Sequence, residues 1–484
     1  MVYDTVVIEC STEGTEGAEV NEFFDGPENV NIKTTLDLVA DAKCLHMVRN
    51  VDIYVSYPTT PLQGLEAVIE RMRGAAGEWA GVRKLVLNLY PWGLEEGDEF
   101  PPAADYEDEI ASSSSALAAL MPRLREITFD DFSETPVICV LYGRLAGFYA
   151  DQLQVLHGNN PPVAPQDRVF ARLRDVKITG FQFESLEGKL PRLDPEVIES
   201  LVLKRLAAND MWSMFCADSD GCAITFPRLA HLDLKYRPRF TMDYEQLPDE
   251  RPWYPQFPAA KRVRISSGDK ECHSMDNAVF PNRLESLDIS ACFGTLSVFA
   301  GRKVHVSQNL TLSVDFEPDV NYHSIDIANR MLEAADSCSL RRLEIASMDE
   351  IPPELITYMG LTHLDLNGPT NADDVMELIC RLPHLVDLRV GSLTLTDAQT
   401  DFSIPECTEH EPVAPLNTQI RSFDINFVGQ GELSDLGNQM LTYLLLKIPT
   451  LKSITTPFVP KKHRQAIIDK YVQWYPHLAN VKLV

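Results

Sequence analysis

The sequence predicts an α/β solenoid with a horseshoe shape, in which parallel strands line the concave face and helices line the convex face. Three observations support this fold class. An apolar comb of the form L-x-x-L-x-L recurs along the chain. A proline stands just ahead of many combs, as in F-P-R-L and L-P-H-L, and proline ends a helix before a strand begins. Segments with helical periodicity lie between the combs, so each repeat adds one helix and one strand through a right-handed crossover.

The comb at residues 284–292, L-E-S-L-D-I-S-A-C, is typical of a leucine-rich repeat, with apolar residues at positions 1, 4 and 6 and Cys at position 9. The intervals between combs, 21 to 42 residues, are irregular. We therefore expect a single solenoid of about 15 to 16 irregular repeats over residues 34–484. The combs begin at residues 48, 82, 124, 150, 173, 198, 229, 260, 284, 340, 361, 385, 420, 451 and 478, with a degenerate one near 307.

Residues 1–33 are expected to form an N-terminal strand, over 2–10, and an acidic loop that could cap the first repeat. Thr34 or Thr35 could begin a helix that carries Leu36. The next helix carries Leu62, Leu65, Ile69 and Met72 on one face, and a short one starts near residue 110. Further helices are predicted at 324–336, 372–382 behind an Asn371 cap, 433–448 and 461–475. Segments rich in Pro and polar residues predict exposed loop insertions at 91–109, 237–258 and 396–418.

The composition indicates which kinds of partner and which cellular compartment to expect for this protein. The chain has 484 residues, of which 43 are Lys or Arg and 71 are Asp or Glu, for a net charge of −28. This charge opposes generic binding to nucleic acid or an anionic membrane and favours a protein partner with a basic surface. The cysteines stand singly, and Cys139, Cys292 and Cys380 have apolar neighbours, as buried free thiols do. With no signal peptide and no apolar run of membrane length, we expect a soluble protein of the reducing cytoplasm or nucleus.

Comb position 5 faces away from the core, because the side chains of a strand alternate between its two faces. In fourteen repeats this position carries six acidic residues, where composition predicts about two. The excess lies between residues 233 and 424 and predicts a protein-binding row on the concave face, unless an acidic protein simply places Asp at exposed strand positions. The fourteen residues are Asp52, Val86, Thr128, Lys177, Val202, Asp233, Arg264, Asp288, Glu344, Asp365, Arg389, Asp424, Thr455 and Lys482. The predicted binding residues are Asp233, Arg264, Asp288, Glu344, Asp365, Arg389 and Asp424.

The sequence contains none of the phosphate-loop, dinucleotide, zinc-protease or serine-hydrolase motifs that were sought, so we expect no catalytic residue, cofactor or metal. The histidines beside combs are expected to pack or to face solvent, and the remaining polar clusters lack metal-site spacing. A basic cluster opens the last predicted helix and could be a solvated face or a partner contact. These residues are His231, His363 and His384; Asp218, Asp220 and Gly221; Cys216, Cys222, Cys272 and His273; and Lys461, Lys462, His463 and Arg464.

The Cys-type repeat, the L-P-x-L joins and the stretch G-L-E-A-V-I-E-R-M-R-G-A-A-G-E-W-A-G-V-R-K-L-V-L at 64–87 resemble the irregular repeats of fungal F-box/leucine-rich-repeat proteins. The resemblance implies a non-enzymatic interaction scaffold, the substrate-recognition part of a cullin-type ubiquitin ligase that holds a ligase adaptor through an F-box. Residues 1–33 lack the L-P-x-E-I-L-x-x-I-F pattern, so no adaptor-binding residue is assigned. Two alternatives are a GTPase-activating protein resembling the Ran GTPase-activating family, whose repeats are more regular, and a degenerate paralogue without a partner.

Overall fold

The computed structural model describes most of the chain, in the following ranges. They are residues 4–12, 30–36, 43–57, 62–75, 79–91, 102–129, 136–159, 168–180, 190–206, 211, 214–215, 224–236, 255–267, 278–291, 305–314, 339–346, 358–394, 415–417, 419–427, 433–456 and 461–483. The chain divides into two compact units, residues 1–260 with 277–280, and residues 261–276 with 281–484. We call them unit 1 and unit 2 and describe each by itself.

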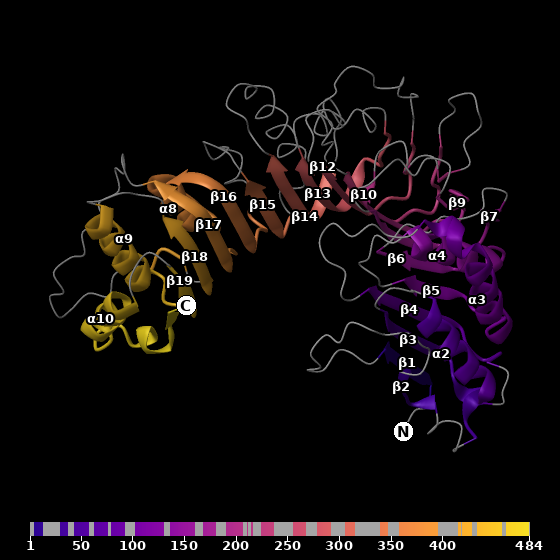
Figure 1. Ribbon diagram of the computed structural model, residues 1–484. Helices are drawn as coiled ribbons and strands as arrows, with labels where there is room; N and C mark the ends of the chain where they lie inside the picture. The colour runs from indigo at the N-terminus through magenta and orange to yellow at the C-terminus, as the bar shows by residue number, and fades with distance from the viewer. Residues whose placement is uncertain are drawn as a thin grey trace. The chain divides into compact units, whose positions relative to one another are not determined.

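Unit 1 is a stack of parallel strands, each paired with the next along the chain (Figure 1). The strands are β1 (Thr5–Thr12), β3 (Asn50–Tyr57), β4 (Lys84–Pro91), β5 (Glu126–Phe129), β6 (Val155–Gly158), β8 (Asp175–Thr179), β10 (Ser200–Leu206) and β11 (His231–Tyr236). Strand β2 (Val30–Thr34) runs antiparallel to β1, and the short strands β7 (Val169–Phe170) and β9 (Arg192–Leu193) pair separately. The predicted N-terminal strand is present as β1 and belongs to the same parallel stack. The prediction of a loop up to residue 33 is wrong at its end, because β2 begins at Val30.

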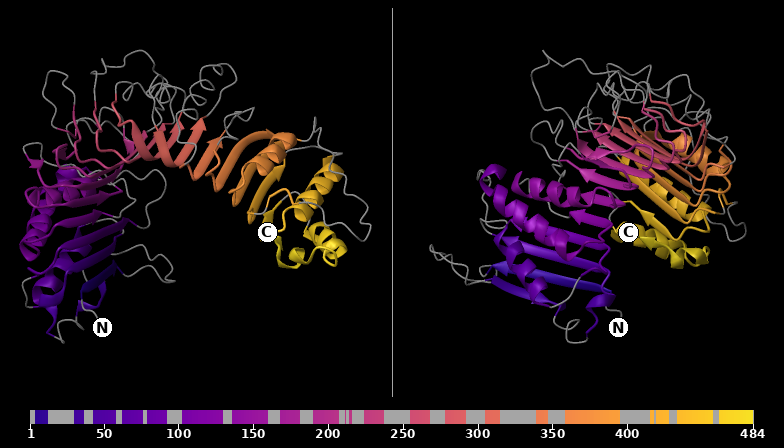
Figure 2. Two further views of the ribbon diagram at one scale, coloured as in Figure 1. Left: turned by 180° about the vertical axis from the view of Figure 1, so that it is seen from behind. Right: turned by 90° about the vertical axis from the view of Figure 1, so that its right-hand side faces the viewer.

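The helices of unit 1 pack side by side on one face of its strands (Figure 2). They are α2 (Gln63–Gly74), α3 (Glu107–Leu120) and α4 (Pro136–Phe148), with short 3₁₀ helices η2 (Leu45–Met47) and η3 (Ala103–Tyr106). Helix α2 buries the apolar stripe that predicted it, including Leu65 and Met72. The prediction of a loop up to residue 109 is wrong at its end, because η3 and the first turn of α3 lie there. The sequence reading missed α4, whose first half is apolar on every side and therefore shows little helical periodicity.

Unit 2 repeats the arrangement with parallel strands that pair in chain order. Its strands are β12 (Arg262–Ser267), β13 (Arg283–Ala291), β14 (His305–Val314), β15 (Arg342–Ala346), β16 (His363–Asn371), β17 (Asp387–Thr394), β18 (Ser422–Phe427), β19 (Ser453–Thr455) and β20 (Lys482–Leu483). Its helices are α8 (Ala372–Arg381), α9 (Leu433–Lys447), α10 (Lys461–Tyr471) and the 3₁₀ helix η6 (Pro476–Asn480). The predicted fold class, an open α/β stack of leucine-rich-repeat type, is therefore confirmed in both units. One continuous solenoid over residues 34–484 stays a prediction, and the predicted helix at 324–336 lies outside the described residues.

Comb positions 4 and 6 supply the core, as the pattern predicts: Leu364 and Leu366 of β16 are 2% and 4% exposed. Two combs are out of register with the prediction. The comb expected at residue 150 begins at Leu153, because Leu153 and Leu156 are the buried pair. In the last repeat Lys482 lies opposite Ser453, which is a third and not a fifth position.

Polar side chains fasten the ends of α8. Asn371 accepts a hydrogen bond from the backbone N–H of Asp373 at 3.1 Å, which confirms the predicted cap. At the other end buried Asn417 donates to the carbonyls of Ile379 and Leu382 at 3.0 and 3.1 Å. Its Oδ1 also accepts two backbone N–H groups, at 2.7 and 3.1 Å. The predicted insertion at 396–418 therefore ends in a buried anchor, and its earlier part lies outside the described residues.

An arginine at comb position 2 fastens successive turns in both units. Its guanidinium donates across the repeat to the carbonyl of the residue just before the next comb. The bonds join Arg49 to Gly81 at 3.3 Å, Arg83 to Arg123 at 3.2 Å and Arg341 to Gly360 at 2.9 Å. These turn carbonyls have no strand partner of their own, so the bonds satisfy acceptors that the repeat geometry leaves over.

Candidate protein-binding face

The fifth comb positions of unit 2 form one row of side chains in strand register, which we call the face row. Each member lies directly opposite the next on the neighbouring strand, and neighbouring strands lie about 4.8 Å apart. The face row is Arg264, Asp288, Thr311, Glu344, Asp365, Arg389, Asp424 and Thr455. Six of the seven predicted binding residues are therefore brought together.

The seventh predicted residue, Asp233, lies in unit 1. It ends the corresponding row there, which runs through Asp52, Val86, Thr128, His157, Lys177, Val202 and Asp233. The Asp233 carboxylate is 3.3 Å from the ammonium group of Lys204 on the neighbouring strand and is largely buried. Asp233 is thus engaged in its own unit, and we treat the face row of unit 2 as the candidate surface.

Two arginines neutralise most carboxylates of the face row. Arg264 Nε lies 3.0 Å from Asp288 Oδ2. Arg389 bridges two strands, with Nη1 3.3 Å from Asp365 Oδ2 and Nε 3.4 Å from Asp424 Oδ2. The side chains of Arg264 and Arg389 are more than half exposed, at 53% and 59%, whereas the Asp365 side chain is only 12% exposed. The arginines therefore form the outer layer and hold the carboxylates beneath them.

One step of the row has two carboxylates opposite one another. Glu344 on β15 directly faces Asp365 on β16, an arrangement that destabilises a sheet. Asp365 Oδ2 contacts Arg389, but Oδ1 is buried without a hydrogen-bond partner among the described residues. Burial raises the pKa of the Asp365 carboxyl, Glu344 adds to the rise, and Arg389 and Arg342 oppose it. The two arginines named here act on Asp365, and among the described residues no ion pair links either of them to Glu344.

A hollow of about 360 Å³ opens over strands β15 to β19 beside this step. Its charged lining comprises three carboxylates, two guanidinium groups and one imidazole: Asp365, Asp387, Asp424, Arg342, Arg389 and His363. The ring nitrogen Nε2 of His363 is 2.8 Å from Asp387 Oδ2, and Nδ1 is 2.8 Å from the Thr362 hydroxyl. The hollow is polar, shallow enough to face solvent, and suited to holding the charged end of a partner's side chain.

The third comb positions contribute a second row that sequence reasoning missed. His363 and Asp387 are directly opposite one another at this position, and Ser422 follows on β18. Strand alternation carries the signal, because position 3 faces the same way as position 5. His363 is half exposed and contacts the Asp387 carboxylate, so the expectation of simple packing or solvation is incomplete for it, while His384 is exposed.

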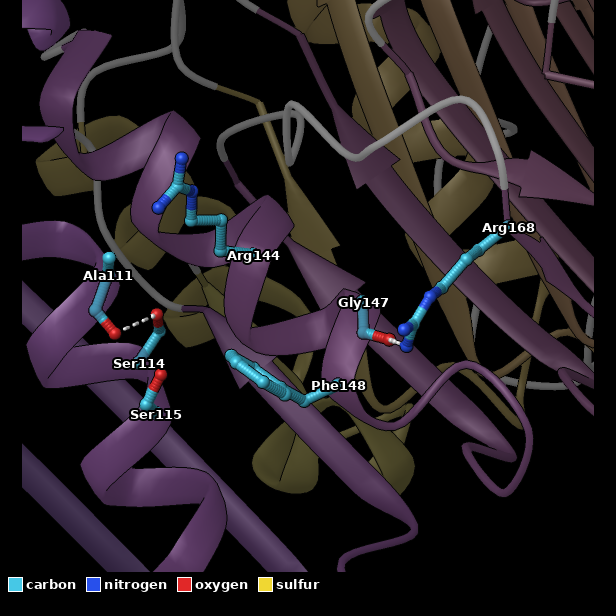
Figure 3. A pocket seen from close by; sticks show the side chains of 7 residues that line it. All are labelled: Ala111, Ser114, Ser115, Arg144, Gly147, Phe148 and Arg168. Carbon is cyan, nitrogen blue, oxygen red and sulfur yellow. Dashed lines mark hydrogen bonds between the residues drawn. The ribbon is translucent and has the colours of Figure 1, made fainter.

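A second pocket, of about 330 Å³, lies on the helical side of unit 1 (Figure 3). Helix α3 contributes small residues such as Ser114, and Gly147 and the half-exposed Phe148 end helix α4. Its polar groups are engaged: the Ser114 hydroxyl donates to the carbonyl of Ile110 at 2.6 Å, and Arg168 donates to the carbonyl of Gly147 at 3.1 Å. Both bonds hold these side chains against the backbone of α3 and α4.

Two other expectations concern single residues. Cys380 is exposed, so its assignment as a buried thiol is wrong; it lies on the solvent side of α8. Cys10 is buried, and burial raises its pKa to about 11. Arg464 of the basic cluster on α10 is buried, so an exposed cluster over all four residues is also wrong. The polar group at 216–222, with Cys272, His273 and Cys292, lies outside the described residues.

Among the residues that the structure describes, no three His, Cys, Asp or Glu side chains come close enough to hold a metal ion. None of the described helices is long and apolar enough to cross a membrane. No protein-family model matches the chain, and a search of curated proteins found no match.

Proposed function

We propose that this chain is a non-enzymatic interaction scaffold that recognises a basic segment of another protein through the face row and hollow of unit 2. The observation that carries the proposal is the step from Glu344 to Asp365, where two carboxylates face one another beside an open hollow. A Lys or Arg side chain of a partner placed here would relieve that repulsion. The parallel strands hold the carboxylates in fixed positions, so little conformational entropy is lost on binding.

The charges in and next to the hollow favour a cationic ligand over an anionic one: three carboxylates and two guanidinium groups line it, and Glu344 lies next to it, opposite Asp365. Arg389 already neutralises Asp365 and Asp424 in part, and His363 pairs with Asp387. Glu344 receives only a neutral amide hydrogen bond, from Asn367 at 3.4 Å. A partner's cation therefore finds a carboxylate that no cation of the described chain already holds.

The test is the binding of a fluorescent octapeptide of alternating Lys and Ser to the full-length protein, measured by anisotropy. The double variant Glu344→Gln/Asp424→Asn keeps side-chain shape and removes two charges of the face row. Because a partly exposed charge pair contributes about 0.2 to 1 kcal/mol, we expect the Kd to rise about fivefold.

The matched control is Glu377→Gln on the outer side of α8, where Glu377 pairs with Arg381 at 3.0 Å. It removes one acidic charge away from the face row and should leave the Kd unchanged. An equal rise in Kd for both variants would show that the peptide responds only to the overall negative charge of the protein, and the proposal would then be wrong.

The finer form of the proposal is that the basic partner is a substrate presented to a cullin-type ubiquitin ligase. It rests on the resemblance of the repeats alone. Affinity purification of the tagged protein from its native cells, followed by mass spectrometry, tests it: recovery of a cullin with its F-box adaptor is the expected result, and partners without them would refute the ligase role while leaving the binding face intact.

A further inference from the structure

Unit 1 contains a cluster of four arginines, although the chain as a whole is strongly negative. Arg49, Arg83 and Arg125 occupy comb position 2 of three successive repeats, and Arg123 lies two residues before the third. The backbones are adjacent: the N–H of Arg83 donates to the carbonyl of Arg49 at 2.7 Å, and the N–H of Arg125 donates to that of Arg83 at 2.8 Å. We call these four residues the arginine edge, since they lie where β3, β4 and β5 begin.

Arg49 and Arg83 each use only part of the guanidinium group for hydrogen bonds within the fold. Nη1 of Arg49 donates to the carbonyls of His46, Val48 and Gly81, and Nη1 of Arg83 donates in the same way to its own turn and the next. A guanidinium has five N–H donors, so the others stay available to a ligand. Arg123 and Arg125 are exposed and contribute no such bond.

No carboxylate in the described part of the chain forms an ion pair with any of these four residues. This distinguishes them from the arginines at the same comb level further on, such as Arg174, which lies 3.6 Å from Glu199. The four also repel one another: burial and the charges of Arg125, Arg123 and Arg49 lower the pKa of Arg83. In a chain with a net charge of −28, an uncompensated group of four cations on adjacent rigid strands is a marked exception.

We infer that the arginine edge binds a short acidic segment of a partner protein, with Glu or Asp side chains lying against Arg83, Arg123 and Arg125. Charge complementarity decides the occupant. Arginine binds carboxylates through paired N–H donors, and a row of strand starts about 4.8 Å apart offers several such forks at fixed spacing. The inference does not depend on the binding face of unit 2, because it concerns the opposite ligand charge and a different unit.

A short peptide fits better than a nucleic acid. Screening limits the field of the arginine edge to about 10 Å at 0.1 M salt, so it reaches a few carboxylates only. A nucleic acid extends well beyond that distance and would meet the repulsion of an acidic protein along the rest of its length.

The experiment uses the full-length protein and a fluorescent octaglutamate peptide, measured by anisotropy at low salt. The double variant Arg123→Ala/Arg125→Ala removes two charges and no backbone hydrogen bond that the structure assigns to their side chains. We expect the Kd to rise about tenfold and the difference to vanish near 1 M salt. The control Arg421→Ala removes one arginine from comb position 2 of unit 2 and should leave the Kd unchanged.

A second variant separates charge from shape. Arg123→Lys/Arg125→Lys should keep most of the binding, and circular dichroism should show that all variants stay folded. Equal weakening by Arg421→Ala would overturn the inference, and so would unchanged binding in Arg123→Ala/Arg125→Ala. A single-stranded oligonucleotide that binds more tightly than octaglutamate, with the same sensitivity to these variants, would overturn the choice of a peptide.

Discussion

Replacing Arg389 by Met tests whether the face row is held together by its arginines. The change removes both bridges, to Asp365 and to Asp424, and keeps much of the aliphatic side chain. It leaves the Asp365 carboxylate, 12% exposed, opposite Glu344 with no cation at its Oδ2. The variant therefore measures how much the repulsion between Glu344 and Asp365 destabilises the fold when Arg389 no longer neutralises it in part.

The expected loss follows from the exposure of each partner. The bridge to Asp424 is surface-like and contributes about 0.5 kcal/mol. An unpaired, mostly buried carboxylate costs about 1 to 3 kcal/mol, and the lower half of that range applies because the Arg389 side chain is 59% exposed and screened by solvent. The sum is about 2 kcal/mol, or a fall in Tm of roughly 4 to 8 °C for a cooperative unit of this size.

Thermal unfolding followed by circular dichroism measures the loss, with Arg264→Met as the matched control. Arg264 has a similar exposure, 53%, but its partner Asp288 is 27% exposed, so we expect a loss of only about 0.5 kcal/mol. Adding Asp365→Asn to Arg389→Met should restore about half of the stability. Equal losses in the two arginine variants, or no restoration by Asp365→Asn, would refute the reasoning.

The pH dependence has a defined sign. The folded-state pKa of Asp365 is raised, so the folded protein binds more protons there than the unfolded chain does. Its stability cost is fully present above the folded-state pKa and disappears as pH falls below the unfolded value. The deficit of Arg389→Met should therefore be smaller at about pH 5 than at about pH 8.

Two further predictions concern polar contacts elsewhere. Asn417→Ala should lower the free energy of unfolding by about 2 to 3 kcal/mol in chemical denaturation, because it leaves two carbonyls and two N–H groups at the end of α8 without their hydrogen-bond partner. A loss below about 1 kcal/mol would contradict the anchor role. His157→Ala should raise the pKa of Asp175, which His157 holds below its usual range at 3.3 Å, as carboxyl NMR titration would show. Because a lowered carboxyl pKa stabilises the fold above the unfolded value, that variant should lose stability near neutral pH and lose little below about pH 3.

The repeat pattern was sufficient to predict the strands, because each comb buries the same two positions in every repeat. The pattern did not predict the structure where too many apolar residues hid the helical periodicity, or where several apolar residues allowed more than one strand register. The first half of helix α4 is apolar on every side and shows little helical periodicity, and the comb near residue 150 offered Ala150, Leu153 and Leu156 at competing registers. Register there depends on which residues the neighbouring strands bury, and a single repeat does not contain that information.

For the candidate site, the sequence predicted the alignment of the face row but not its pairing. Strand alternation places Asp365, Arg389 and Asp424 on one face, and equal comb positions place them side by side. Whether Arg389 turns toward one carboxylate or bridges both depends on side-chain packing, and so does the contact of His363 with Asp387. The arginine edge depends on the strand register that brings comb position 2 of three repeats together, and the acidic excess at position 5 does not indicate it.

Net charge is a poor guide to partners for a protein built in this way. In a parallel stack, every comb position becomes a row, so charges that are far apart in sequence become neighbours in space. Within a row, paired charges such as Arg264 with Asp288 contribute little to binding, because they already satisfy one another. The charges left over are the ones that a ligand can use: the Glu344 carboxylate in unit 2, which faces Asp365, and the arginines from Arg49 to Arg125 in unit 1. This is why we propose a basic ligand for one row and an acidic ligand for another, although a net charge of −28 alone would suggest only the first.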